Sequence, residues 1–193
     1  MRSLLAVLFL SSVVVAQEES CVKIINVNGS ASGTVIAVNG DTSYILTNRH
    51  VAPDANKRCW IIRNGQLTDT TFIKAHAELD VALLSVKAKL KAATLAESDA
   101  GEGDEVKHYG SATGPQKGKA TGVVTFVGGV KVSSGSYFSV PGDSGSGLFN
   151  AKGQLVGVFY ARLGPPEMPY AANNYPIAVR LSDVKEFVKE LVK

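Results

Sequence analysis

Short apolar runs alternate with turn residues along most of the chain. The runs are rich in Val, Ile, Tyr and Phe, and Asn-Gly, Gly-Asp and Lys-Gly pairs separate them, which is typical of β-strands joined by tight turns. The clearest runs are CVKIINV, GTVIAV, SYILTN, CWIIR, DVALLSV, GVVTFV and QLVGVFYA. Many short strands at regular spacing predict an all-β fold built from barrels or sandwiches.

A more polar stretch, Lys87 to Glu105, divides these runs into two comparable groups. Composition shifts of this kind favour a domain boundary, so we expect one β unit over 17–91 and a second over 92–193.

Only the end of the chain has a helical period. Ser182 can cap a helix with lysines in its last turn, and we expect this helix over 182–193 as a terminal latch. The apolar residues on its one face are Val184, Phe187, Val188 and Leu191.

The first residues have the layout of a secretory signal peptide. MRSLLAVLFLSSVVVAQEES carries a cation at Arg2, an apolar run from Leu4 and small residues ending at Ala16. The run is too short for a confident membrane span, so we expect a signal peptide over 1–16 and a secreted chain, extracellular or periplasmic. An N-terminal anchor helix that stays in place is the alternative.

Composition and charge exclude some classes of partner. The chain has 193 residues, 45% of them hydrophobic and 19% charged, which suits a soluble protein with one large or two small cores. The net charge is +3 and the basic residues are scattered, so neither a nucleic-acid-binding stripe nor a membrane-binding patch is predicted.

The two cysteines, Cys21 and Cys59, form no CxxC pair and lie near no histidine cluster. A zinc site is therefore not predicted, and we expect no bound metal. In an exported chain a disulfide between the two is the preferred interpretation. Two buried free thiols are the alternative.

Three polar residues are candidates for catalysis. The stretch VPGDSGSGLF surrounds Ser144 with residues that turns also need, His50 follows the strand SYIL, and Asp80 opens the strand DVALLSV. The other histidines, His76 and His108, fit surface or strand positions. The chain order His, Asp, Ser differs from that of α/β-hydrolases and of subtilisins, and is the order of the two-barrel β proteases.

TNRHV, DVALLSV and GDSGSG resemble the three catalytic blocks of the chymotrypsin-like, or trypsin-like, serine peptidases. GDEVKHYGSATG, GKATGVVTFVGG and YPIAVRLSDVKEFVKEL resemble the second barrel and terminal helix of the periplasmic high-temperature-requirement branch. The resemblance implies two packed six-stranded antiparallel Greek-key β-barrels with a C-terminal α-helix. It also implies a monomeric endopeptidase that acts on protein or peptide substrates without a cofactor. The sequence ends after the helix, so a PDZ module is not expected.

The resemblance also implies roles for individual residues. His50 is the general base, Asp80 orients it, and Ser144 forms an acyl-enzyme. The backbone N–H groups of Gly142 and Ser144 form the oxyanion hole. A catalytically inactive binding module on the same fold is the alternative function.

The substrate pocket implied by the resemblance has Phe138 at its base and Ser139 beside it. Its walls come from Tyr160, Ala161, Arg162 and Tyr175. No carboxylate lies at the base, so a Lys or Arg side chain would be buried without a counter-charge. A small or aliphatic residue before the cleaved bond is predicted, with an acidic residue as the alternative if Arg162 reaches the pocket mouth.

Trypsin-like zymogens are activated when a newly freed N-terminus pairs with the aspartate before the nucleophile. Here the first strand begins near Cys21, so we expect activation by signal removal alone. Asp143 must then have a different partner.

Overall fold

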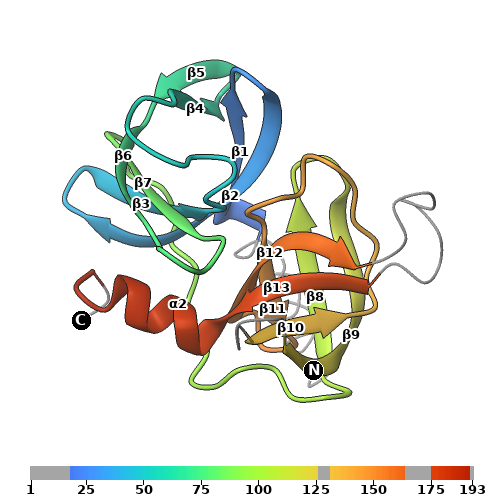
Figure 1. The fold of residues 1–193 in the computed structure, drawn as a ribbon. Coiled ribbons are helices and arrows are strands. Elements are labelled where there is room, and N and C mark those ends of the chain that lie inside the picture. Colours follow the sequence, from blue (N-terminus) through green and yellow to red (C-terminus); the bar gives the residue numbers. More distant parts are fainter. Residues whose placement is uncertain (1–17, 126–130, 164–174, 192–193) are drawn as a thin grey trace, which may run out of the picture.

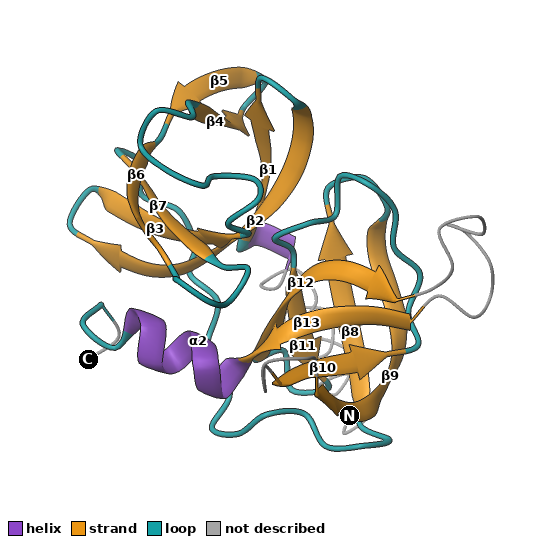
Figure 2. Ribbon diagram, viewed as in Figure 1, coloured by secondary structure: helices purple, strands orange, loops and turns teal. Residues whose placement is uncertain are grey.

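The computed structural model describes residues 18–125, 131–163 and 175–191, and the predicted signal peptide over 1–16 lies outside these ranges. Two β units lie side by side, and helix α2 (Leu181–Val188) runs from the second unit along the first (Figure 1). Strands make up most of the described chain (Figure 2). The predicted all-β class with a terminal helix is confirmed. No helix within the described ranges is long and apolar enough to cross a membrane.

The N-terminal unit is a seven-stranded antiparallel sheet in the order β5-β4-β1-β2-β3-β7-β6. Its strands are β1 (Cys21–Asn26), β2 (Gly29–Asn39), β3 (Thr42–Thr47), β4 (Cys59–Arg63), β5 (Gln66–Asp69), β6 (Thr71–Ala75) and β7 (Ala82–Val86). This sheet has one strand more than predicted. The polar strand β5 leaves no hydrophobic pattern, and it folds back on β4 through Asn64 and Gly65, whose φ angles are 49° and 75°.

The C-terminal unit is a closed six-stranded barrel in the order β10-β13-β12-β11-β8-β9, with the predicted number of strands. Its strands are β8 (Glu105–Gly110), β9 (Gly114–Thr125), β10 (Lys131–Gly135), β11 (Gly147–Asn150), β12 (Leu155–Leu163) and β13 (Tyr175–Arg180). The proposed boundary at 91/92 falls in the segment between β7 and β8.

Each unit has its own apolar core, and a third apolar cluster joins the two. In that third cluster Leu46 and Leu83 of the N-terminal sheet pack with Phe149 of the barrel. The helix adds Val184 and Phe187, so its apolar face covers the seam between the units. Burial of side chains from both units in one cluster holds the two units in a fixed relation.

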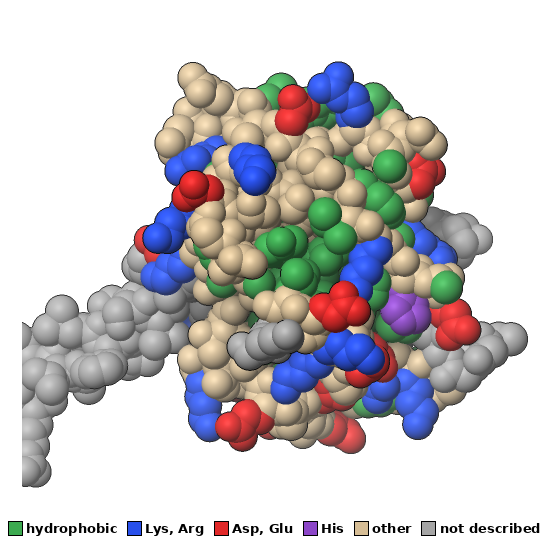
Figure 3. Space-filling view, turned by 90° about the vertical axis from the view of Figure 1, so that its left-hand side faces the viewer, with side chains coloured by type: hydrophobic (Ala, Val, Ile, Leu, Met, Phe, Trp, Pro, Cys, Tyr) green, Lys and Arg blue, Asp and Glu red, His purple; other side chains and the backbone are tan. Residues whose placement is uncertain are grey.

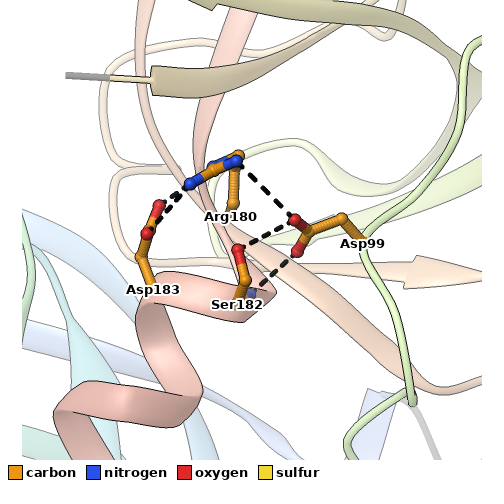
Figure 4. Close-up of polar contacts among 4 residues, drawn as sticks. All are labelled: Asp99, Arg180, Ser182 and Asp183. Carbon is orange, nitrogen blue, oxygen red and sulfur yellow. Dashed lines mark hydrogen bonds and ion pairs between the residues drawn. The ribbon is translucent and has the colours of Figure 1, made fainter. Parts of the chain in front are cut away.

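Helix α2 begins at Leu181, one residue before the predicted start, and Ser182 is not its cap. The N-cap position is Arg180, which makes no side-chain cap hydrogen bond. Instead, Asp99 of the connecting segment accepts hydrogen bonds of 2.8 Å from both the amide and the hydroxyl of Ser182 (Figure 4). Arg180 forms two 3.0 Å hydrogen bonds to Asp183 and a 4.0 Å ion pair with Asp99. A carboxylate from a distant segment therefore satisfies the helix N-terminus.

The predicted disulfide is wrong, because Cys21 and Cys59 are not joined by a disulfide in the structure. Strand pairing gives the reason: Cys59 lies opposite Asn26 at one end of β1, whereas Cys21 lies at the other end. Five residues of strand separate these ends by about 16 Å, and a disulfide needs Cα atoms within about 7 Å. Burial raises the pKa of the Cys59 thiol and raises that of Cys21 to about 12, so both thiols are poor nucleophiles.

Charged side chains of both signs are interspersed on the face shown in Figure 3, around a central apolar patch. This face therefore presents no extended field of one sign. Within the described ranges, no group of three or more His, Cys, Asp or Glu side chains lies where it could hold a metal ion.

Candidate active site

His50 and Asp80 lie together at one end of the N-terminal sheet. His50 follows β3 and Asp80 precedes β7, and pairing of these strands brings the two residues side by side. Asp80 Oδ2 lies 2.6 Å from His50 Nδ1, and Asp80 Oδ1 accepts a 2.9 Å hydrogen bond from the His50 amide. The carboxylate thus binds both the ring and the backbone of His50. A neutral imidazole held this way carries its proton on Nδ1 and leaves Nε2 as an acceptor.

Neighbouring side chains fix the loop that carries Asp80. Asn48 Nδ2 donates to the Asp80 carbonyl oxygen at 2.8 Å, and Arg49 donates to the carbonyl oxygen of His76 at 3.1 Å. Burial by itself raises the pKa of the Asp80 carboxyl, but the hydrogen bonds from His50 and the charge of Arg49 outweigh it and lower the pKa below its usual value. Asp80 is therefore an anion at neutral pH, suited to stabilise a protonated imidazole.

Ser144 and His50 line the same cleft between the two units, together with Gly142 and Pro141. The cleft has a volume of about 240 Å³. Among the described residues the Ser144 hydroxyl has no hydrogen-bond partner, so it is not bonded to the imidazole. Contacts between nucleophile and base commonly tighten only when a substrate binds.

Backbone hydrogen bonds hold the nucleophile loop against both units. The amide of Ser32, in β2, donates to the Ser144 carbonyl at 2.8 Å, and the Gly145 amide donates to the carbonyl of Phe159, in β12, at 2.9 Å. Gly145 has a φ of +90°, and a Cβ on it would lie 2.1 Å from the Ser32 carbonyl oxygen. Only glycine allows this close approach of the loop to β2.

Two serine hydroxyls, one from each unit, fix the backbone at Gly142. The Gly142 carbonyl oxygen accepts hydrogen bonds from Ser32 Oγ at 2.8 Å and from Ser111 Oγ at 3.2 Å. Neither the Gly142 amide nor the Ser144 amide donates to another residue of the described ranges. Both amides of the expected oxyanion hole are therefore available as donors.

Asp143 is fully buried, and backbone amides satisfy its carboxylate. Oδ1 accepts 3.1 Å hydrogen bonds from Ala112 and Thr113, and Oδ2 accepts one of 3.0 Å from Val140. Asp143 is thus paired with backbone amides and not with a chain terminus, as the sequence analysis expected. A Cβ on Gly110 would lie 2.0 Å from Asp143 Oδ1, so this glycine makes room for the buried carboxylate.

The segment before the nucleophile has side chains that alternate between inward and outward positions. Phe138 is 55% exposed, whereas Tyr137 and Ser139 are 5% and 2% exposed. Successive side chains of an extended chain point to opposite sides, so Tyr137 and Ser139 share the inward side. Phe138 therefore lies on the outward side of this segment, and its place at the base of the substrate pocket stays a prediction.

The other expected pocket residues lie on β12 and β13. Tyr160 lies near Asp80, and burial together with the negative charge of Asp80 raises the pKa of its hydroxyl to about 12. Ala161 and Arg162 are half-buried. The backbone of Tyr175 belongs to β13, and its side chain lies outside the described part of the structure.

His108 is a residue of this region that the sequence analysis did not assign to the site. It is fully buried on β8, with Nε2 2.5 Å from Ser146 Oγ. Its ring stacks on Tyr137 at 5.1 Å between centroids and meets the edge of Phe159 at 5.3 Å. The alternation in VKHYG places His108 on the same inward side as the buried Val106, which is the signal that could have identified it.

His108 predicts a pH dependence of stability. Burial lowers its pKa to about 4, against the opposing effect of Asp143. The unfolded chain takes up this proton near pH 6.5, so the contribution to stability is fully present above about pH 6.5 and is lost as the pH falls toward 4, by roughly 3 kcal/mol in total. Urea unfolding at several pH values between 7.5 and 4.5 measures how steeply the free energy of unfolding changes with pH. His108→Gln is expected to weaken this pH dependence, and His76→Gln is expected to leave it as in the wild-type chain. An equal pH dependence in the two variants would show that His108 is not its source.

Comparison with known proteins places these features in a family. The family model for the trypsin-like peptidase domain matches residues 31–158. A probable periplasmic DegP-like serine endoprotease of Ectopseudomonas mendocina is 34% identical over 137 residues, which cover 66% of this chain and 28% of that protein. A probable periplasmic DegP-like serine endoprotease of Buchnera aphidicola is 30% identical over 146 residues, which cover 70% of this chain and 30% of that protein. The chain thus spans less than a third of the length of these two curated relatives.

Among solved structures, the active form of the Rv3671c protease from M. tuberculosis superimposes with a TM-score of 0.75 at 20% identity, covering 93% of this chain and 84% of that chain. At this identity the likeness shows the shared fold. Together with the family match, it means that the chain belongs to the trypsin-like peptidase domain family and is homologous to the HtrA-type serine proteases DegP and DegQ.

Proposed function

We propose that this chain is a secreted serine endopeptidase that hydrolyses peptide bonds through His50, Asp80 and Ser144. The observation that carries the proposal is the doubly hydrogen-bonded His50–Asp80 pair, which shares a cleft with Ser144. The two DegP-like relatives named above are described as probable periplasmic serine endoproteases, and residues 1–16 have the layout of an export signal.

In the first half of the reaction, Ser144 Oγ attacks the carbonyl carbon of the substrate while His50 Nε2 takes its proton. The new negative charge lies on the former carbonyl oxygen, where the amides of Gly142 and Ser144 are the donors. Collapse of this intermediate breaks the C–N bond, and the imidazolium gives its proton to the leaving amine. The product is an ester between the substrate acyl group and Ser144.

In the second half, water replaces the amine. His50 Nε2 takes a proton from the water, the resulting nucleophile attacks the ester, and Ser144 Oγ leaves with that proton. Asp80 remains an anion throughout and stabilises the imidazolium in both halves. All groups needed for this sequence of steps belong to the chain, so we propose no cofactor.

The hydrogen bonds around Gly142 and Asp143 support the oxyanion step. The Gly142 carbonyl is held by Ser32 and Ser111, and the Asp143 carboxylate by three amides. Donors that are oriented before the reaction need no reorganisation when the charge develops, and each is worth about 3 to 4 kcal/mol of barrier in other proteases.

A direct test is incubation of the mature chain with an unfolded protein substrate, followed by mass spectrometry of the fragments. Internal cleavage by the wild-type chain and none by Ser144→Ala is the expected result. Intact substrate in both reactions would favour the inactive binding module, and equal fragments from both would show that Ser144 is not the nucleophile.

A further inference from the structure

The cleft that holds Ser144 and His50 extends to one side of the nucleophile loop, and a lysine lines it there. Besides the two catalytic side chains, its lining includes residues of the β1–β2 hairpin and Lys57. None of the described residues of the expected pocket for the side chain before the cleaved bond lines this cleft. The cleft is therefore a separate subsite that shares its catalytic residues with that pocket.

The nucleophile loop lies between two strands, and this tells which part of a substrate the cleft holds. The Ser144 carbonyl is bonded to the amide of Ser32 in β2, whereas the Gly145 amide is bonded to the carbonyl of Phe159 in β12. The pocket for the residue before the cleaved bond is expected on the β12 side, and the cleft lies at the start of β2. The residues after the cleaved bond therefore fall in the cleft. His50, which protonates the leaving amine, lines it too.

Lys57 is fixed at the edge of this cleft. It is half-buried, whereas residues 53–56 and Arg58 are exposed. Arg58 has other partners, since it lies over the Trp60 ring at 5.2 Å and forms a 3.0 Å ion pair with Asp69. The backbone at Lys57 is held by the buried Cys59, whose Sγ lies 3.7 Å from the Lys57 carbonyl oxygen.

The positive charge of Lys57 is not neutralised within the described part of the chain. Lys57 forms no ion pair there, and the cleft lining contains no Asp or Glu. The neighbouring Asp54 is exposed, and its Oδ1 accepts a 2.7 Å hydrogen bond from the Asn56 amide. Lys57 is thus the one lining side chain that is permanently charged.

An unpaired cation in a partly enclosed cleft attracts a carboxylate and repels another cation. We propose that Lys57 selects an Asp or Glu side chain in one of the first two residues after the cleaved bond. This inference rests on the proposed function. It concerns the opposite side of the cleaved bond from the predicted apolar preference, so the two preferences are independent.

The test uses peptides built on a sequence that the chain cleaves in an unfolded protein. Glu, Gln or Lys is placed at the first and then at the second position after the cleaved bond. At one of these positions the Glu peptide is expected to have a kcat/KM at least about fivefold above that of the Gln peptide, because a partly exposed ion pair is worth about 1 kcal/mol. The Lys peptide is expected to be the slowest, and added salt should reduce the differences.

Two substitutions at Lys57 and one control show whether this side chain is the cause. Lys57→Met keeps the apolar stem and is expected to bring the ratio of Glu to Gln turnover close to one. Lys57→Glu is expected to reverse the preference, so that the Lys peptide is cleaved faster than the Glu peptide. Arg58→Met changes the net charge by the same amount at the adjacent residue and should keep the wild-type ratio.

Equal turnover of the Glu and Gln peptides at both positions, or a Glu preference that persists in Lys57→Glu, would overturn the inference. Labelling of Ser144 by a phosphonofluoridate, run in parallel, separates this failure from failure of the proposed function. A chain that is labelled and cleaves the Glu and Gln peptides equally is a peptidase without this specificity. A chain that is neither labelled nor active overturns both proposals.

Discussion

Ser144→Ala is expected to lower the kcat/KM of peptide hydrolysis by about 10⁴-fold or more, and His50→Ala by a similar factor. Without Oγ there is no atom to attack the carbonyl carbon, and without the imidazole the hydroxyl stays protonated. Because the two side chains perform one step together, the double variant should be no slower than either single variant. Steady-state rates on one peptide measure all three.

Ser136→Ala is the matched control, since it removes a hydroxyl from an exposed residue of the same barrel and should keep the wild-type rate. Losses that multiply in the double variant would mean that the two residues act in separate steps. Activity retained in Ser144→Ala would show that Ser144 is not the nucleophile.

Gly145→Ala is expected to reduce activity by at least about 100-fold and to destabilise the chain by roughly 3 kcal/mol or more. The new Cβ would lie 2.1 Å from the Ser32 carbonyl oxygen and 2.5 Å from Thr47 Oγ1. The nucleophile loop would have to move away from β2 to relieve these contacts. This movement of the loop would displace the amides of Gly142 and Ser144, which are the expected oxyanion donors.

Gly103→Ala isolates the steric part of this effect. Gly103 has a φ of +85°, close to the +90° of Gly145, but a Cβ there would meet no atom within 4 Å. Its substitution should cost only about 1 kcal/mol of backbone strain and leave activity intact. Urea unfolding and peptide hydrolysis compare the two variants, and equal costs would show that contact between the loop and β2 is unimportant.

The sequence predicted the elements whose residues repeat in a regular pattern. Short apolar runs identified strands β1 to β4, β7, β9 and β12, and the apolar face of 182–193 identified the helix. Strands β6 and β10 lie in none of these runs. Strand β5 was missed because QLTD is polar and mostly exposed, so its place in the sheet depends on the Asn64-Gly65 turn rather than on burial.

The candidate triad was visible because His50 and Asp80 each lie beside a recognisable strand and Ser144 lies in a glycine-rich turn. The side chains that fix the backbone of the nucleophile loop could not be predicted from the sequence. Ser32 and Ser111 are ordinary serines in the sequence, and only the packing of one unit on the other brings both hydroxyls to Gly142.

The separation of the two cysteines and the outward position of Phe138 have a common cause, which is strand register. The pairing of Cys59 with Asn26 separates the cysteines, and the alternation at 136–139 turns Phe138 outward and Tyr137 inward. A shift of one residue reverses the side that each side chain faces, and residue spacing alone does not specify that side.

Reaction with a phosphonofluoridate, followed by peptide mass spectrometry, is the most direct test of whether Ser144 is an activated nucleophile. Attack by Ser144 Oγ forms an O–P bond and releases fluoride, with the hydroxyl proton taken by His50. One label per chain, on Ser144 and absent from His50→Ala, is the predicted result. No label on the folded wild-type chain, or a label on a different serine, would contradict a catalytic role for Ser144.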